Sequence, residues 1–361
     1  MIRFHDINSD RIGHFSGNME VYLSQRDAGM HQRRVIDIFY RDKIVCNVQL
    51  MEMWARVIPI PRPYALWRRL AWANRKLPGG KAHEYKDGRY YDTYGVLEKT
   101  KPHLLFTGEE EKRGQEALWA MGIPEGKPFV CFIVRDKAYL SALMKGQDFS
   151  YHDYRDTNIE KYRLAMEGLS QRGYGSVRMG AAVKNKLRFS CPGLIDYAAN
   201  GMRDDFRDVY LTAKCSFFIF SESGLGVLAM AFRRPVVCLD LVPMRLAHAW
   251  GSDYVLTFRK LWLKSEKRFL RFREIVHSEI GMYLHTRQYQ ESGIELIENT
   301  AEEVRDAIEE TAARCEGRWE TNEEYEDLQR RFWSFYADSS ELRVLRARVG
   351  SKFLLQNKDL L

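Results

Sequence analysis

The sequence predicts an α/β fold in which buried parallel strands alternate with helices. Apolar runs of strand length recur along the chain, and segments of helical spacing separate them. The clearest unit is a strand over 216–220, a helix over 225–232 and a second strand over 236–241. Because such crossovers are right-handed in nearly all proteins, residues 221–224 are expected at the carboxyl edge of the sheet.

The other elements follow from apolar runs, helical periodicity and capping residues. Thr300 with Glu303 three residues later predicts the start of the helix over 301–315, and Gly173 ends the helix over 159–172. The remaining predicted strands cover residues 1–7, 35–40, 129–134, 175–180 and 294–298. The remaining predicted helices cover residues 18–26, 47–57, 64–72, 109–121, 208–211, 270–275 and the tail from 322 to 361.

A chain of 361 residues suits two domains. The segment 122–128 holds two prolines and two glycines, so it predicts the domain boundary. We expect a first domain over 1–122, a second over 128–316 and C-terminal helices over 317–361.

Composition narrows the class of protein. The apolar content of 45% indicates a folded globular chain, and six cysteines without metal-ligand spacing indicate a reduced, cytoplasmic protein. No signal peptide or apolar run long enough to span a bilayer is visible. The net charge of +7 favours anionic ligands or an anionic membrane surface and does not single out nucleic acid, because the basic residues are spread along the chain.

The segment Ser221-Glu222-Ser223-Gly224 is the first candidate site. Serine at a helix start can cap free N–H groups, glycine allows close approach of a ligand, and the helix dipole favours an anion such as phosphate. The alternative is that Ser221 and Ser223 only cap the helix.

Three arginines stand near strand ends or in loops of the second domain: Arg135, Arg155 and Arg178. They are candidates for binding a diphosphate. Ion pairs with Asp136 and Asp156 are the alternative explanation.

Asp10 and His14 follow the first predicted strand, and each is a candidate general base or an ordinary surface residue. The helix over 64–72, YALWRRLAW, combines aromatic and basic residues. It is either an amphipathic helix that touches a membrane or a lipid-linked acceptor, or an ordinary packed helix with its arginines in water.

Several segments together resemble a known family. FVCFIVRD, CSFFIFSESGLGVLAMAFRRPVVCLDLVPM, IELIENTAEEVRDAI and ARVGSKFLLQNKDLL are similar to bacterial glycosyltransferases found among surface-polysaccharide biosynthesis genes, and RIGHFSGNMEVYL also matches. These enzymes are of GT-B type and are distantly similar to fucosyltransferase-like and heptosyltransferase-like proteins.

The resemblance implies two Rossmann-like domains facing across a cleft, with C-terminal helices that pack back on the first domain. It implies that Ser221, Ser223 and Gly224 cradle the diphosphate of a nucleotide-sugar donor and that Glu222 holds ribose hydroxyls. Arg135 would neutralise the leaving diphosphate, and Arg155 and Arg178 would be further donor contacts. The acceptor would be a glycan or a lipid-linked molecule, at the cytoplasmic face of the inner membrane.

Fixed arginines and a helix N-terminus stabilise the negative charge that develops on a departing diphosphate, so we expect no metal ion or other cofactor. In an inverting reaction, Asp10 or His14 would activate the acceptor hydroxyl. The alternatives are a nucleotide-sugar epimerase and a basic binding protein for nucleic acid, which ranks last because no aromatic and basic stacking motif is present.

Overall fold

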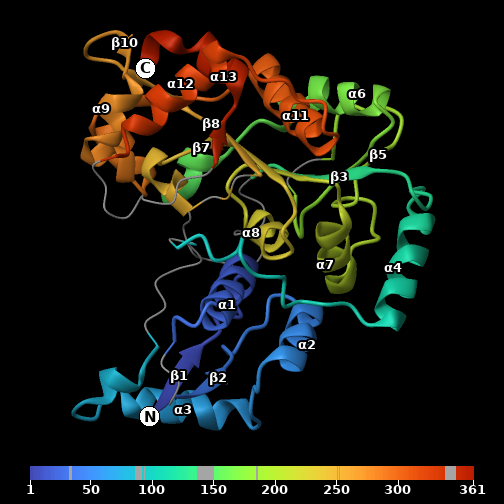
Figure 1. Ribbon diagram of the computed structural model, residues 1–361, viewed down its shortest axis with the longest axis vertical. Coiled ribbons are helices and arrows are strands. Elements are labelled where there is room, and N and C mark those ends of the chain that lie inside the picture. Colours follow the sequence, from blue (N-terminus) through green and yellow to red (C-terminus); the bar gives the residue numbers. More distant parts are fainter. Residues whose placement is uncertain are drawn as a thin grey trace.

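The computed structural model has two lobes, each with a parallel sheet (Figure 1). It describes residues 1–31, 35–85, 92, 94–135, 150–183, 186–249, 251, 253–337 and 347–361. The mixed α/β class is therefore confirmed. None of the described helices is long and apolar enough to cross a membrane.

The first lobe is built on two parallel strands. Its elements are β1 (Ile2–Asp6), α1 (Ile12–Asp27), β2 (Ile36–Tyr40), α2 (Val48–Val57), α3 (Tyr64–Asn74) and the 3-10 helix η1 (Gly80–His83). The pairing runs from Ile2 opposite Ile36 to Asp6 opposite Tyr40, so both strands end at one edge. The side chain of Asn47 caps α2 by accepting a hydrogen bond from the Leu50 amide at 2.8 Å.

The second lobe holds a seven-stranded parallel sheet in the order β12-β8-β7-β6-β3-β4-β5. The strands are β3 (Phe129–Ile133), β4 (Gly175–Arg178), β5 (Leu194–Ile195), β6 (Phe218–Phe220), β7 (Val236–Leu241), β8 (Tyr254–Phe258) and β12 (Arg348–Val349). A small antiparallel sheet contains β9 (Lys260–Leu263), β10 (Arg268–Phe269) and β11 (Ile294–Ile297).

Helices cover both faces of the large sheet. The helices of this lobe are α6 (Arg163–Gln171), α7 (Asp205–Lys214), α8 (Gly224–Ala231), α9 (Phe272–Val276), α10 (Thr286–Glu291), α11 (Ala301–Cys315), α12 (Glu323–Ser334) and α13 (Ser351–Gln356). The short 3-10 helices are η2 (Ser150–Arg155), η3 (Ile159–Tyr162), η4 (Met244–Ala249), η5 (Glu279–Met282) and η7 (Lys358–Leu360). Val130 and Phe132 of β3 pack with α6 and α11, whereas Cys131 belongs to the core that includes α7 and α8. This alternation is the two-residue period of a strand buried on both faces.

Three expectations are corrected at the level of elements. Helix α1 begins at Ile12 rather than near Asn18, so His14 lies in its first turn instead of in a loop. The strand expected over 294–298 forms as β11, but it pairs antiparallel with β9 outside the large sheet. Strands β8 and β12 were not predicted, because β8 adjoins a basic segment and β12 is two residues long.

The C-terminal helices pack on the second lobe, which differs from the expectation that they return to the first. β12 extends the large sheet beside β8, and α13 packs against α11 and α12 (Figure 1). Ser351 at the start of α13 donates its amide hydrogen to Glu310 of α11 at 2.7 Å. The tail therefore completes the core of the second lobe.

Helix α4 (Gly108–Ala120) joins the two lobes, although we placed it in the first domain. Lys214 of α7 forms an ion pair with Glu111 at 2.7 Å, and Arg56 of α2 forms one with Glu110 at 3.0 Å. The chain then enters the second lobe at β3. The predicted boundary at 122–128 thus separates α4 from β3 in sequence, while α4 contacts both lobes in space.

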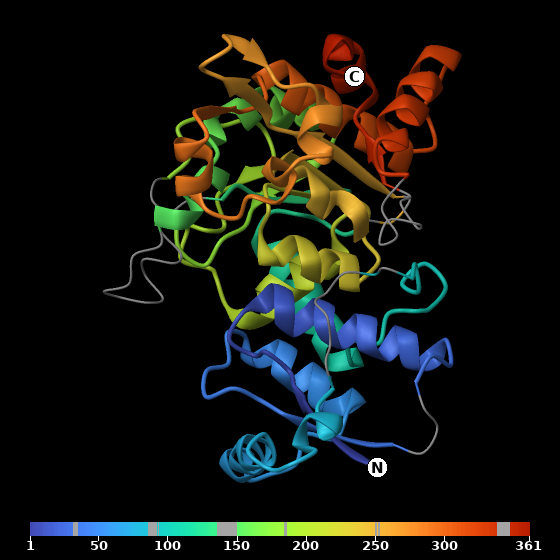
Figure 2. The same ribbon diagram turned by 90° about the vertical axis from the view of Figure 1, so that its left-hand side faces the viewer.

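Helices α1 and α8 form the main contact between the lobes (Figure 2). Glycines stand where they approach most closely: a Cβ atom on Gly224 would lie 2.8 Å from Ile12 Cγ2 and 2.9 Å from the Gly13 nitrogen. The absence of side chains at both glycines lets the two helix starts meet backbone to backbone.

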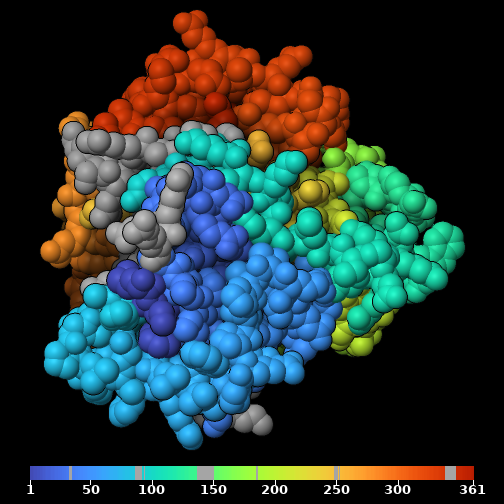
Figure 3. Space-filling model, turned by 60° about the horizontal axis from the view of Figure 1, so that its bottom comes forward, coloured from blue at the N-terminus to red at the C-terminus, as the bar shows by residue number. Residues whose placement is uncertain are grey.

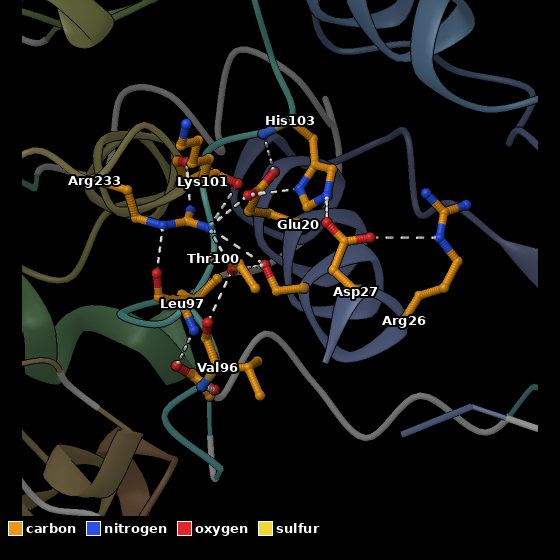
Figure 4. A network of polar contacts seen from close by, with 12 residues as sticks. Glu20, Arg26, Asp27, Val96, Leu97, Thr100, Lys101, His103 and Arg233 are labelled. Carbon is orange, nitrogen blue, oxygen red and sulfur yellow. Dashed lines mark hydrogen bonds and ion pairs between the residues drawn. The ribbon is translucent and has the colours of Figure 1, made fainter. Parts of the chain in front are cut away.

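A buried polar network holds the far end of the same contact (Figure 4). Glu20 of α1 accepts hydrogen bonds from Arg233, just beyond α8, at 2.8 Å and contacts the His103 ring at 3.0 Å. Arg233 also donates to the Leu97 carbonyl at 2.7 Å. The carboxylate of Glu20 is 1% exposed, so these partners compensate a charge that is almost fully removed from water.

Candidate functional site

The site lies at the point where the order of the large sheet reverses. The chain starts in β3, adds β4 and β5 on one side, and then places β6, β7 and β8 on the other. Open α/β sheets bind ligands outside the carboxyl ends of the strands that flank such a switch point. Here these strands are β3 and β6, so Arg135 and the segment 221–224 lie at this edge.

A direct hydrogen bond joins the two strand ends. The Arg135 amide donates to Ser221 Oγ at 2.9 Å, and the Ser221 amide donates to the Ile133 carbonyl at 3.2 Å. Ser221 is 1% exposed. Its hydroxyl therefore bridges β3 and β6 as an acceptor, and its own O–H group remains a donor.

Ser223 has the opposite environment. It stands at the N-cap position of α8, yet its side chain makes no capping hydrogen bond. Its Oγ atom is removed from solvent and has no hydrogen-bond partner among the described residues. An unsatisfied buried hydroxyl costs free energy, and here it lies beside the open N–H groups of a helix start. A ligand atom is the missing partner that this arrangement suits.

Glu222 is held in an unusual conformation between these serines. Its φ angle is +37°, in the left-handed region that side chains other than glycine rarely adopt. Burial raises the pKa of its carboxyl group to about 7, although Arg155, Arg135 and Arg259 all act to lower it. Its Oε2 atom has no hydrogen-bond partner among the described residues. Glu222 thus combines a strained backbone with a carboxyl group of raised pKa, and it lies just after β6 at the switch point of the sheet.

Arginines surround Glu222. Arg135 lies with its Nε atom 3.9 Å from Asp156 Oδ1, which is too long for a hydrogen bond, so the expected ion pair is loose. Burial, and then the nearby Arg155, lower the pKa of Arg135. The Nε atoms of Arg135, Arg155 and Arg259 are all buried without a hydrogen-bond partner among the described residues. Asp156 and Asp240 also lie near these arginines, but burial raises the pKa of Asp240 to about 6 and that of Glu222 to about 7. The carboxyl groups therefore balance the guanidinium charge only in part, which suits an anionic ligand.

His152 positions Arg155. The Arg155 Nη2 atom lies 2.7 Å from His152 Nδ1. Burial, followed by the charges of Arg155 and Arg135, lowers the pKa of His152 to about 3. The imidazole is therefore neutral at physiological pH and can accept the hydrogen bond from the guanidinium.

Arg178 stands on the strand next to β3 and is engaged by a carboxylate. It is 3% exposed at the end of β4 and forms an ion pair with Asp196 at 3.4 Å. The same carboxylate accepts a hydrogen bond from the Leu187 amide at 3.0 Å. Arg178 therefore serves the packing beside β5. Asp136, the partner first suggested for Arg135, lies outside the described residues.

Asp10 and His14 belong to the first lobe. Asp10 lies just before α1 and His14 lies in its first turn, next to Gly13, which contacts Gly224 of α8. Asp10 Oδ2 is 4.0 Å from Arg11 Nε, and burial together with Arg11 lowers the pKa of His14. Because Gly13 meets Gly224 at the start of α8, this loop lies beside the edge of the sheet that carries the arginine cluster, and Arg11 contributes to lowering the pKa of His152. Burial, with Asp6 and Asp10 nearby, raises the pKa of Asp42 to about 6.

Three residues of this region were missed in the sequence. Arg259 directly follows β8 and donates to Thr157 Oγ1 at 2.8 Å, so a charged residue after an apolar strand was its visible signal. His152 and Asp42 had no such signal, because their environments are set by distant segments. No group of three or more histidine, cysteine, aspartate or glutamate side chains suited to a metal ion occurs among the described residues.

Comparisons with solved structures give remote likenesses. A glycosyl transferase family 9 protein from Veillonella parvula is 12% identical, with a TM-score of 0.42 over 66% of this chain and 80% of that one. ADP-heptose lps heptosyltransferase II from E. coli is 15% identical, with a TM-score of 0.42 over 71% and 90%. E. coli heptosyltransferase WaaC with ADP-2-deoxy-2-fluoro heptose is 10% identical, with a TM-score of 0.33 over 71% and 93%. No protein-family model and no curated protein matches the sequence.

Proposed function

We propose that the protein is a glycosyltransferase that takes a sugar from a nucleotide-sugar donor. The observation that carries the proposal is the unpartnered Ser223 hydroxyl at the start of α8, beside an arginine cluster at the switch point of the sheet. A diphosphate satisfies each part of this arrangement, because its oxygens accept hydrogen bonds from a hydroxyl, helix N–H groups and guanidinium groups.

The chemistry of the transfer explains the excess of positive charge. When the bond from the sugar to the diphosphate breaks, negative charge grows on the leaving group. Guanidinium groups fixed before the reaction stabilise that charge more in the transition state than in the bound donor. Arg135 and Arg155 would provide this stabilisation without a metal ion or another cofactor, and Ser223 and Gly224 would cradle the diphosphate.

The remaining assignments follow from the same placement. Glu222 would hold ribose hydroxyls by hydrogen bonds, which its protonated carboxyl group can make without repelling the phosphates. Asp10 or His14 of the first lobe would activate the hydroxyl of a glycan or lipid-linked acceptor in bacterial surface-polysaccharide synthesis. Arg178 would be a further donor contact in addition to its ion pair with Asp196, and Ser221 would be another through its O–H group, since it accepts from the Arg135 amide.

A nucleotide-binding experiment tests the proposal. The melting temperature would be measured with UDP, GDP, ADP, CMP and dTDP, because a ligand that binds the folded state raises it. We expect one nucleotide to stabilise the wild type. Arg135→Ala and Ser223→Ala should weaken binding by about 10- to 100-fold, as loss of a charge-assisted hydrogen bond does. Arg330→Ala is the matched control, because Arg330 is 68% exposed on α12.

The outcomes separate the alternatives. If no nucleotide binds, or if both site variants bind as well as the wild type, the donor site is not at the switch point. If a nucleotide-sugar is converted without any acceptor, the protein is an epimerase on the same fold. If arbitrary DNA binds with a steep dependence on salt instead, the nucleic-acid alternative replaces both.

A further inference from the structure

Helix α3 turns an apolar face toward solvent. Leu66, Leu70 and Trp72 are 46%, 42% and 61% exposed, and Ala71 is the buried residue of the helix. Leu66, Leu70 and Ala73 are spaced by four and three residues, so they lie along one edge of the exposed surface of the helix. Ala65 and Trp72 are seven residues apart and lie along its other edge, with the exposed Arg69 between the two edges. A helix on the surface of a globular protein normally directs such a face into the core. The outward face of α3 is therefore not explained by the packing of the first lobe.

Leu77, which lies just beyond the end of the helix, is 63% exposed and adds to this surface. Figure 1 places α3 at the end of the first lobe, away from the second lobe, and Figure 2 shows the helix end-on at the outer edge. The space-filling view from this end shows the light-blue atoms of this part of the chain at the surface (Figure 3). We call the exposed residues Leu66, Leu70, Trp72 and Leu77 the α3 face.

The segment that contains α3 carries charges of one sign in the sequence. From residue 53 to residue 83 the sequence has seven basic residues and no acidic one: Arg56, Arg62, Arg68, Arg69, Arg75, Lys76 and Lys81. Arg69, Lys76 and Lys81 are exposed, and Lys76 Nζ lies 5.7 Å from the centre of the Trp72 ring. Two of the seven are paired with acidic residues from outside this segment: Arg75 with Glu84 at 2.7 Å and Arg56 with Glu110 at 3.0 Å. The partner of this face must accordingly accept both apolar side chains and cations.

Other exposed apolar side chains have different surroundings. Trp119 of α4 is 73% exposed, but Glu109, Glu110, Glu111 and Glu116 share its helix. Leu105 is 71% exposed in the segment that leads into α4. Exposed leucine and tryptophan side chains thus occur elsewhere in the chain, and the basic setting distinguishes the α3 face.

We propose that the α3 face docks on the surface of an anionic lipid bilayer. A helix that exposes leucine and tryptophan with lysine and arginine among them can lie in the plane of the headgroups, where the apolar side chains enter the acyl boundary and the cations meet anionic lipids. The proposal rests on the exposed side chains and charges of α3 and does not depend on the reaction at the switch point. Docking at this end leaves the start of α8 uncovered.

Vesicle flotation with the full chain tests this proposal. The vesicles are phosphatidylcholine alone and phosphatidylcholine mixed with phosphatidylglycerol. The wild type should float with the mixed vesicles and much less with phosphatidylcholine. Arg69→Glu changes the charge by two units and should weaken binding by about 30-fold, at roughly fivefold for each charge unit at the surface. The double variant Leu70→Ser with Trp72→Ser should weaken it by more than about tenfold.

Matched controls carry the same changes elsewhere. Leu105→Ser with Trp119→Ser removes exposed apolar side chains, and Arg330→Glu reverses an exposed charge on α12. Both controls should float like the wild type, and unfolding temperatures should show that every variant is folded. Flotation of the α3 variants equal to that of the controls would overturn the proposal. So would concentration-dependent self-association without lipid that Trp72→Ser abolishes, because the α3 face would then bind a second copy of the chain.

Discussion

At the scale of single residues, the most informative side chain is Glu222. A carboxylate beside a diphosphate repels it, yet burial raises the pKa of Glu222 to about 7, so the group is partly protonated at neutral pH. The left-handed φ angle of +37° fixes the residue in the turn between β6 and α8. The protonation state of one side chain therefore changes the charge of the proposed donor site.

Glu222→Gln provides a pH-dependent test of this residue. The protonated carboxyl group is neutral, so nucleotide affinity of the wild type should fall as pH rises through about 7, where the group becomes charged. The glutamine variant should bind at least as tightly and lose this fall. A change of about 1 to 2 kcal/mol in binding free energy is expected for removal of one partly screened charge. Titration calorimetry at several pH values measures it, and equal pH profiles for both proteins would contradict the assignment.

At the scale of elements, the contact of α1 with α8 depends on two glycines. Gly224→Ala would place a methyl group 2.8 Å from Ile12 Cγ2 and 2.9 Å from a backbone nitrogen, so the helices must separate. We expect a loss of about 1 to 3 kcal/mol in the free energy of unfolding, as for other overpacked contacts. Denaturant unfolding monitors the loss.

Gly108→Ala is the matched control for this prediction. Gly108 is also the first residue of a helix, α4, and a Cβ atom there meets nothing within 4 Å. This variant should be as stable as the wild type or slightly more stable, because alanine restricts the unfolded chain. Equal effects of the two substitutions would show that general helix propensity, rather than the contact between α1 and α8, sets the stability.

At the scale of the whole molecule, the network of Glu20, His103 and Arg233 links the lobes and gives stability a pH dependence (Figure 4). Burial lowers the pKa of His103, but the hydrogen bonds to Glu20 and Asp27 outweigh it, so the pKa lies above the ordinary value of 6.5. A raised histidine pKa stabilises the folded state fully below the unfolded value of 6.5. That contribution is lost as pH rises through the folded value.

The melting temperature of the wild type should therefore fall as pH rises above 6.5 by more than that of His103→Gln. Below that pH the variant should be less stable by about 1.5 to 3 kcal/mol, the usual contribution of hydrogen bonds to charged groups. His83→Gln is the control, because its ring contacts the backbone carbonyl of Ile2 at 2.7 Å. Parallel pH curves for the wild type and His103→Gln would show that His103 does not carry the effect.

Local signals were sufficient for many elements and for part of the site. The strand over Val236–Leu241 and the helix over Ala301–Cys315 form as predicted, since an apolar run and the Thr300–Glu303 capping box are readable from neighbouring residues. Strand-end position likewise placed Arg135, and the turn between β6 and α8 placed Ser223, at the carboxyl edge of the large sheet, where the structure has them. These features depend on residues that are close in sequence.

The tertiary structure decided what those residues do. Ser221 bonds to an amide 86 positions away, Arg178 is neutralised by Asp196, and Arg259 reaches the cluster from β8. The tail packs on the second lobe because β12 pairs with β8, and α3 exposes its apolar face. Hydrophobic periodicity specifies which side of an element is apolar, whereas the partner of that side, or the lack of one, is fixed only when distant segments pack together.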